Sequence, residues 1–225
     1  SDGFAIYAKD KKTGVVGVYW VDSENENLKP ASGSAWASAE LAKADALGLI
    51  PESLVDADLT QSITRAEFAA ISVKAYEALS GTVALPNTVN PFTDTSDIEV
   101  LKAYNLGITT GVSATTFEPN TLLNREQAAT MLTRTFKRAT MNGWTIQNDA
   151  QFALTYDKPS AFAEDKDISD WAKDSVYFMA ANNTINGVGD NKSAPKNITS
   201  EEEATGYANA TREQALIIAV RMVEN

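Results

Sequence analysis

The stretch Ile63-Thr64-Arg65-Ala66-Glu67-Phe68 returns in two variants further along the chain. The variants are Leu123-Asn124-Arg125-Glu126-Gln127-Ala128 and Ala210-Thr211-Arg212-Glu213-Gln214-Ala215. Each places Thr or Asn three residues before Glu or Gln, and each opens a segment with apolar residues at helical spacing. This spacing predicts a capping box, in which the first side chain accepts from the N–H three residues on and the Glu or Gln reaches back. We therefore predict three helices, beginning at residues 65, 125 and 212.

An arginine occupies the first helical position of all three segments: Arg65, Arg125 and Arg212. The helix macrodipole disfavours a cation at this position, so its threefold recurrence calls for a reason. Two interpretations remain open. The guanidinium and the free N–H groups of the helix could hold a carboxylate or phosphate. Alternatively, the arginine could pair with an acidic residue of a neighbouring segment and fix the packing.

The composition excludes several classes of function. The chain has 225 residues and a formal net charge of −11, which argues against nucleic acid or an anionic membrane surface as a partner. It contains no Cys and no His, so it has no thiol nucleophile, no Ser-His triad and no His/Cys zinc site. We expect no catalytic residue, no metal and no cofactor.

The sequence also lacks obvious membrane and leader segments. No apolar run approaches the roughly 18 residues of a membrane-spanning helix. Ser1-Asp2-Gly3 lacks the charged and apolar regions that begin a secretory leader. We expect the chain to be the C-terminal part of a larger exported protein.

Two regions outside the repeated segments have strand-like composition. Residues 4–8 and 15–21 are rich in β-branched and aromatic residues and flank a turn signal at 10–14, which predicts a β-hairpin. Residues 22–35 are polar and predict a linker. The 139–160 segment carries spaced aromatic and aliphatic residues, and we expect two short strands there that could pair with the hairpin in a small sheet.

A shorter helix is expected before each capping box. One leads from Trp36 to Leu47 and ends at Gly48, one ends at Gly107, and one follows Trp171 and ends near Asn183, which tolerates the left-handed conformation. Two helices cannot bury both their faces alone, so neighbouring units must share a core.

These features together resemble the S-layer homology domain, over about residues 32–225. The second segment carries the most complete set of motifs: Phe92-Thr93-Asp94, Gly107-Ile108-Thr109-Thr110-Gly111 and Phe117-Glu118-Pro119. The resemblance implies a mainly α fold, with three helical repeats in a pseudo-threefold arrangement and ligand grooves between adjacent units. The expected organisation is a hairpin and linker at 1–31 and repeats at 32–84, 85–160 (with the insertion) and 161–225.

The resemblance implies an extracellular, non-catalytic module that anchors a surface protein to the cell wall. Its ligand would be an anionic secondary cell-wall polysaccharide, commonly pyruvylated, on the peptidoglycan. Arginines would hold the carboxylate, glycine N–H groups would approach the sugar, tryptophans would offer apolar faces, and aspartates would accept hydroxyls or fix a turn. The residues implied are Arg65, Arg125, Arg212, Gly48, Gly111, Gly187, Trp36, Trp171, Asp94 and Asp165.

The three grooves are not equivalent in sequence. Glu52 stands where the other repeats have Gly111 and Gly187, and a carboxylate there would repel an anion. The second repeat lacks the tryptophan, and the third has a long polar loop at 188–209. We expect one or two of the three grooves to bind ligand. For each tryptophan, packing in the core remains an open alternative.

Two other classes of function remain open. The repeats could mediate protein–protein contacts or self-assembly in an envelope array. A glycan-active enzyme would need two carboxylates, for which Asp56 with Asp58, or the Asp165, Asp167 and Asp170 group, could be proposed. The latter group could also bind Ca²⁺, although it lacks the EF-hand glycine and terminal glutamate. Solvated loops explain both clusters more simply.

Overall fold

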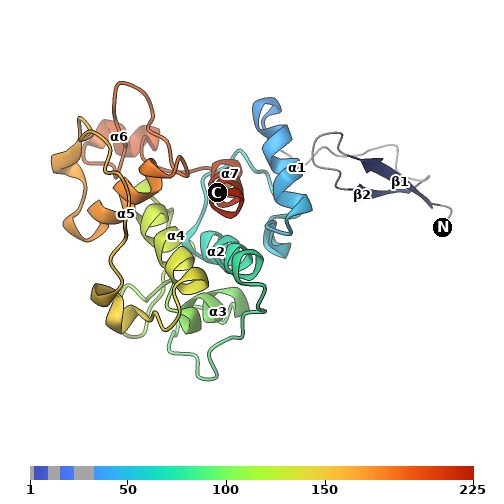
Figure 1. Ribbon diagram of the computed structural model, residues 1–225, viewed down its shortest axis with the longest axis horizontal. Coiled ribbons are helices and arrows are strands. Elements are labelled where there is room, and N and C mark those ends of the chain that lie inside the picture. Colours follow the sequence, from blue (N-terminus) through green and yellow to red (C-terminus); the bar gives the residue numbers. More distant parts are fainter. Residues whose placement is uncertain (1–2, 10–15, 23–32) are drawn as a thin grey trace.

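The computed structural model describes residues 3–9, 16–22 and 33–225, and for the first two ranges it describes the backbone alone. The described chain is mainly helical (Figure 1). Strands β1 (Gly3–Lys9) and β2 (Val16–Asp22) pair antiparallel, with Phe4 opposite Val21. The predicted turn at 10–14 and most of the predicted linker lie outside the described residues.

Apart from α6, the α-helices follow the predicted order. They are α1 (Ser38–Ala46), α2 (Arg65–Ser80), α3 (Ile98–Leu106), α4 (Arg125–Thr140), α5 (Asp170–Ala181), α6 (Ser200–Thr205) and α7 (Arg212–Glu224). Short 3₁₀ helices η1 (Ala35–Ala37), η2 (Glu52–Leu54), η3 (Ile146–Gln151) and η4 (Asp165–Asp167) lie in the connections. None of the helices in the described ranges is long and apolar enough to cross a membrane.

All three predicted capping boxes are present. Thr64, Asn124 and Thr211 are the N-caps of α2, α4 and α7, and each accepts from the backbone N–H three residues on. Glu67, Gln127 and Gln214 bond back to the N-cap N–H groups. The starts of these helices are therefore fixed locally, before any tertiary contact is considered.

The segments that precede these helices meet in a closed ring of backbone hydrogen bonds. Ile63 N–H donates to Ala210 O at 2.9 Å, Ala210 N–H to Leu123 O at 3.4 Å, and Leu123 N–H to Ile63 O at 3.1 Å. Each of these residues directly precedes an N-cap. The ring therefore holds the three capping-box helices together at their N-termini.

The capping-box helices α2, α4 and α7 contact one another, and each packs against one further helix. Helix α3 contacts α2, α5 contacts α4, and α1 contacts α7, while α2 touches both α4 and α7 (Figure 1). Thus α1 packs against the last helix of the chain. One hydrophobic core draws on all of these helices, with Phe68, Leu132 and Leu216 completely buried. The beginning and end of the described helical region are consequently joined in one core.

Two buried glutamates join helices from different parts of the chain. Glu213, 4% exposed, accepts from the N–H and hydroxyl of Ser34 at 2.7 and 2.8 Å, just before η1 and α1. Glu126, 2% exposed, accepts from the same two groups of Ser169, the N-cap of α5, both at 2.9 Å. Each carboxylate thus caps the N-terminus of a helix from another part of the chain.

The prediction of strands at 139–160 was wrong. Residues 146–151 form η3, and no ladder joins this segment to β1 or β2. Trp144 is completely buried, and its indole N–H donates to Asp149 at 2.6 Å, which also accepts from Lys137 at 2.8 Å. These contacts hold the segment in a compact turn, so its apolar residues do not alternate between two faces as in a strand.

The polar loop predicted at 188–209 contains a helix. Thr199 and Glu202 form a fourth capping box, and α6 ends at Gly206, which has a left-handed conformation. The same Thr-x-x-Glu signal is present in the sequence, but the polar, acidic run at 201–203 is typical of a loop. This six-residue helix carries no buried residue, so it lacks the apolar periodicity that marked the other helices.

Candidate functional site

Arg65 extends from the first position of α2 to the turn that follows α3. Its Nε donates to Phe117 O at 3.0 Å and its Nη2 to Thr110 O at 3.3 Å. The guanidinium carbon lies 4.9 Å from the centre of the Phe117 ring. The arginine therefore bridges two segments, and its partners there are neutral.

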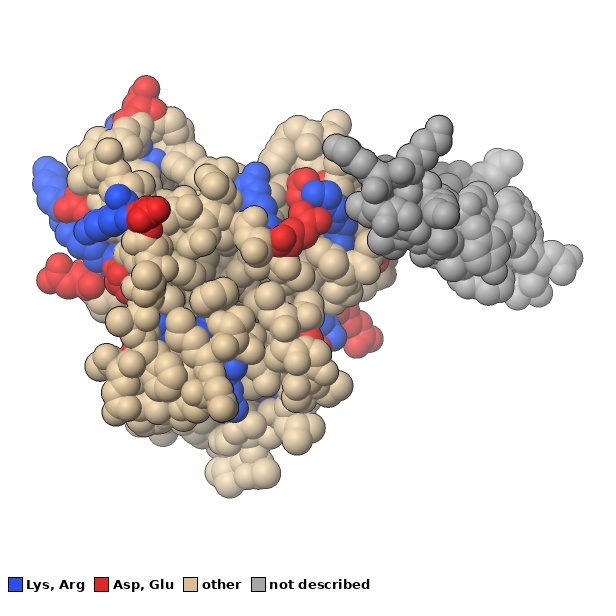
Figure 2. Space-filling model, viewed as in Figure 1, with Lys and Arg blue, Asp and Glu red and all other residues tan. Residues whose placement is uncertain are grey.

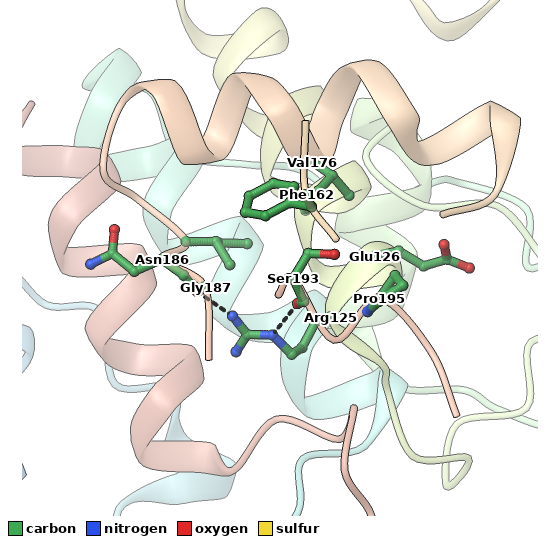
Figure 3. A pocket seen from close by; sticks show the side chains of 10 residues that line it. Arg125, Glu126, Phe162, Val176, Asn186, Gly187, Ser193 and Pro195 are labelled. Atoms are coloured by element: carbon green, nitrogen blue, oxygen red, sulfur yellow. Dashed lines mark hydrogen bonds between the residues drawn. The ribbon is translucent and has the colours of Figure 1, made fainter. Parts of the chain in front are cut away.

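Arg125 repeats this arrangement one step around the molecule. Its Nε donates to Ser193 O at 3.0 Å and its Nη2 donates to Asn186 O (Figure 3). The turn that it contacts follows α5, as the turn at Thr110 follows α3. Two of the three arginines thus bind backbone carbonyls of the next turn along the chain.

Arg212 is different because it has a carboxylate partner. Its Nη2 lies 2.7 Å from Glu67 Oε1, and its Nη1 donates to Asp58 O at 2.9 Å. The hydrogen bond that Arg212 donates to Glu67 raises the pKa of Arg212 above its usual value. Gln127 and Gln214 occupy the position of Glu67 in the other two capping boxes. For Arg212, pairing with an acidic residue of another segment is therefore the observed role.

An open cavity of about 210 Å³ lies beside Arg65. Arg65 from α2, Gly111 from the turn after α3 and Trp171 from α5 line it together. Arg134 and Gln127 of α4 complete the polar part of the wall. Three residues predicted for ligand binding, from three different parts of the chain, therefore meet here.

The two cations of this cavity are partly desolvated. Burial lowers the pKa of both Arg65 and Arg134. The negative charge of Glu118 partly offsets this shift at Arg65, and that of Asp149 partly offsets it at Arg134. In the described part of the chain, neither guanidinium has a carboxylate within 4 Å. An anion in the cavity would offset the free-energy cost of burying these two positive charges.

The cavity at Arg125 is much smaller, about 10 Å³. Phe162 and Val176 line this cavity together with Arg125 and Gly187 (Figure 3), and Ile185 lines it as well. This volume is at the lower limit for a single water molecule. Burial lowers the pKa of Arg125. The arrangement places Arg125 and Gly187 together but leaves no room for a sugar between them.

The two tryptophans lie at the surface and not in the core. Trp36 is 64% exposed and Trp171 is 59% exposed, so core packing does not account for either. Trp171 lines the Arg65 cavity, whereas Trp36 lines neither arginine cavity. Trp171 stands two residues after Ser169, the N-cap of α5, and Glu99 stands two residues after Asp97, the N-cap of α3.

The glycine positions are explained by steric limits. A Cβ at Gly111 would lie 2.3 Å from Ser113 O, and one at Gly187 would lie 2.6 Å from Lys192 O. Gly48 has a left-handed φ of 68° after α1, and its N–H donates to Asp45 O at 2.9 Å. The N–H of Gly48 is therefore already engaged within its own turn and joins neither arginine cavity.

The two predicted aspartates have structural partners. Asp94 accepts from the N–H groups of Phe117 and Glu118, the latter at 2.7 Å, and these bonds lower the pKa of Asp94. Asp165 accepts from Tyr177 at 2.6 Å and from Lys173 at 3.1 Å, and these bonds lower its pKa. Neither aspartate lines an arginine cavity. Both fix local structure, the second of the two roles considered from the sequence.

The true counterpart of Asp94 is Glu164. It follows Phe162 by two residues, as Asp94 follows Phe92, and accepts from the N–H groups of Ser193 and Ala194 at 2.9 and 2.8 Å. The glutamate side chain, longer than that of Asp94, thus accepts from two successive N–H groups of a turn, as Asp94 does. Sequence reasoning missed it because the acidic residue beside it, Asp165, matched the expected residue type.

Arg134 and Gln127 of the cavity were also missed. A signal was available, because a cation stands ten residues after each capping-box N-cap: Lys74, Arg134 and Arg221. Of the proposed acidic clusters, Asp58 accepts from Thr60 and Gln61 within its own turn. Across the described residues, no group of three or more Asp and Glu side chains could hold a metal ion.

Comparisons with known proteins agree with part of the sequence interpretation. Residues 91–129 match the S-layer homology domain. The chain is also 31% identical, over 149 residues, to the exoglucanase XynX of Acetivibrio thermocellus. This match covers 64% of the chain and spans only 12% of the length of that relative. The comparisons therefore support the S-layer homology family through one matched domain, which contains α3, Gly111 and the start of α4.

Proposed function

We propose that this chain anchors a protein to the bacterial cell surface by binding an anionic cell-wall polysaccharide in the Arg65 cavity. The matched S-layer homology domain, a type of cell-wall anchoring module, supports the general role. The observation that carries the specific proposal is the pair of desolvated guanidiniums, Arg65 and Arg134, that line one open cavity without a carboxylate partner in the described structure.

The chemistry of the cavity suits a sugar with a carboxylate, such as a pyruvate ketal. Two guanidiniums can hold a carboxylate by charge-assisted hydrogen bonds, and exposed Trp171 offers an apolar face to a sugar ring. The net charge of −11 does not preclude this, since the described charges on one face form small separate patches among uncharged residues (Figure 2). The anion would meet a local cationic site.

We further propose that helix pairs α1–α2, α3–α4 and α5–α7 are three S-layer homology repeats around a pseudo-threefold axis. The ring of backbone hydrogen bonds between Ile63, Leu123 and Ala210 supports this arrangement. The three grooves would then differ in function. The Arg65 groove binds ligand, the Arg125 site is filled, and Arg212 is neutralised by Glu67.

Co-sedimentation with cell-wall sacculi tests the proposal. Native sacculi are compared with sacculi stripped of secondary polymer, using wild type, Arg65→Gln, Arg134→Gln and, as a control, Arg212→Gln. We expect binding to native sacculi only, about tenfold weaker in the Arg65 and Arg134 variants and near wild type in the control.

Three outcomes would contradict it. Equal binding to stripped sacculi would indicate peptidoglycan as the ligand. Product release from the sacculi would indicate an enzyme. Absence of binding by the folded protein would leave a protein–protein or self-assembly module as the alternative.

A further inference from the structure

A second cavity, of about 320 Å³, lies between the end of α3 and the 139–151 segment. Tyr104, Asn105 and Gly107 form one wall, and Arg138 and Gln147 form the other. Its volume falls at the lower end of the range for small-molecule sites. The sequence marked this segment as longer than a simple connection but assigned it no function.

The wall formed by the 139–151 segment is held firmly in place. Trp144 is completely buried, and Asp149 accepts from both its indole N–H and the ammonium of Lys137. Ile146 packs against Gly107 at the end of α3. A Cβ added to Gly107 would lie 3.5 Å from the Cβ of Ile146. The cavity is therefore preformed, and a ligand does not need to order the segment first.

Several polar groups in this cavity lack a protein partner. Within the described structure, the hydroxyl of Tyr104 and the amide of Gln147 make no hydrogen bond, whereas Arg138 donates from Nη1 to Trp144 O at 3.2 Å. Asn105 uses its Nδ2 to bind Leu85 O at 3.0 Å, which leaves its carbonyl oxygen available. The cavity thus combines an aromatic ring with unpaired donors and acceptors, and it has no carboxylate in its wall.

The second cavity adjoins the first. Thr109 and Thr110 line both, so the two cavities share the turn that follows α3. The Arg65 cavity has two cations, whereas this one has a single cation and mostly neutral amides and hydroxyls. Neutral amides and hydroxyls suit the hydroxyl and acetamide groups of an uncharged sugar.

We propose that this second cavity is a binding subsite for an uncharged hexose or N-acetylhexosamine, adjacent to the anionic residue in the Arg65 cavity. The connection between the two subsites rests on the proposed function, and the chain would then recognise at least two linked sugars. The neutral sugar could come from the secondary polymer or from the peptidoglycan strand.

The subsite is tested by amide-resolved NMR titration with two separate probes. The first probe is the neutral disaccharide N,N′-diacetylchitobiose, and the second is a monosaccharide that carries a pyruvate ketal. The test variant is Gln147→Ala, because Gln147 is exposed and has no protein partner to lose. Gln151→Ala is the matched control, since Gln151 is exposed on the same 3₁₀ helix and lies outside the cavity.

We expect the neutral probe to shift the resonances of Gly107 and the side-chain amide of Gln147. Gln147→Ala should weaken its binding about 3- to 10-fold, the effect of one hydrogen bond, and Gln151→Ala should leave it unchanged. Absence of shifts at these positions, or equal effects of the two substitutions, would overturn the subsite. Loss of ketal binding alone would instead overturn the proposed function and leave the neutral subsite standing.

Linked sugars distinguish adjacent subsites from independent ones. A trisaccharide with the ketal at one end should bind wild type at least tenfold more tightly than the ketal monosaccharide does. Gln147→Ala should reduce this gain by about 3- to 10-fold while it leaves the affinity for the monosaccharide unchanged. An equal gain in both proteins would refute the adjacency. Comparison of native with stripped sacculi then identifies the source of the neutral sugar.

Discussion

Replacement of Glu126 tests how α5 is joined to α4. The carboxylate is 2% exposed and accepts two hydrogen bonds from Ser169, both of 2.9 Å. A hydrogen bond to a charged group contributes about 1.5–3 kcal/mol. Glu126→Ala removes both bonds and leaves the N–H of Ser169 without its acceptor, so we expect a loss of roughly 3–5 kcal/mol in the free energy of unfolding. Urea denaturation measures this loss.

Two further variants separate the hydrogen bonds from general damage. Glu126→Gln retains one acceptor oxygen and should lose about half as much stability as Glu126→Ala. The double variant Glu126→Ala with Ser169→Ala should lose less than the sum of the single losses, because the two side chains interact directly. Glu203→Gln on exposed α6 is the control and should change stability by less than about 0.5 kcal/mol. A loss below about 1 kcal/mol for Glu126→Ala would refute the reasoning.

Three further predictions concern the turns and the ion pairs. Gly111→Ala should cost about 1–3 kcal/mol in unfolding experiments, since its Cβ would lie 2.3 Å from Ser113 O; a neutral effect would contradict this steric reading. Glu67→Gln should keep the capping box but lower the free energy of unfolding by about 0.5–1.5 kcal/mol, because the ion pair with Arg212 is lost. High salt should reduce this difference between variant and wild type, and a difference independent of salt would argue against the ion pair. Burial raises the pKa of Asp149, but hydrogen bonds from a lysine and an indole outweigh it, so the folded pKa is depressed. The ionised carboxylate of Asp149 should therefore stabilise the fold above about pH 4, and this stabilisation should be lost as the pH falls through the depressed pKa. In Asp149→Asn, the urea midpoint should fall less steeply between neutral and acid pH than in wild type.

Local signals predicted the capping-box helices well. A capping box depends on residues three apart, so Thr64, Asn124 and Thr211 could be identified as N-caps without knowledge of the fold. The conformation of the segment around Trp144 could not be predicted from local signals. Its conformation depends on Asp149 and Lys137, which come together only when η3 packs against α4.

The site was predicted in part. Arg65, Gly111 and Trp171 were all named from the sequence, and the structure brings them to one cavity. The repeated motif alone does not show how the environments of the three arginines differ. The difference depends on Glu67, whose place in the capping box gave no reason to expect a second role as partner of Arg212. It also depends on the apolar side chains that close the space beside Arg125.

The central claim is that the Arg65 cavity recognises the negative charge of a wall sugar. Calorimetric titration of the pyruvate-ketal monosaccharide and its uncharged methyl ester tests it most directly, with wild type and Arg65→Gln. We expect the acid to bind wild type at least tenfold more tightly than the ester, and this difference to disappear in the folded variant. Equal binding of acid and ester to wild type, or an undiminished difference in Arg65→Gln, would contradict the account.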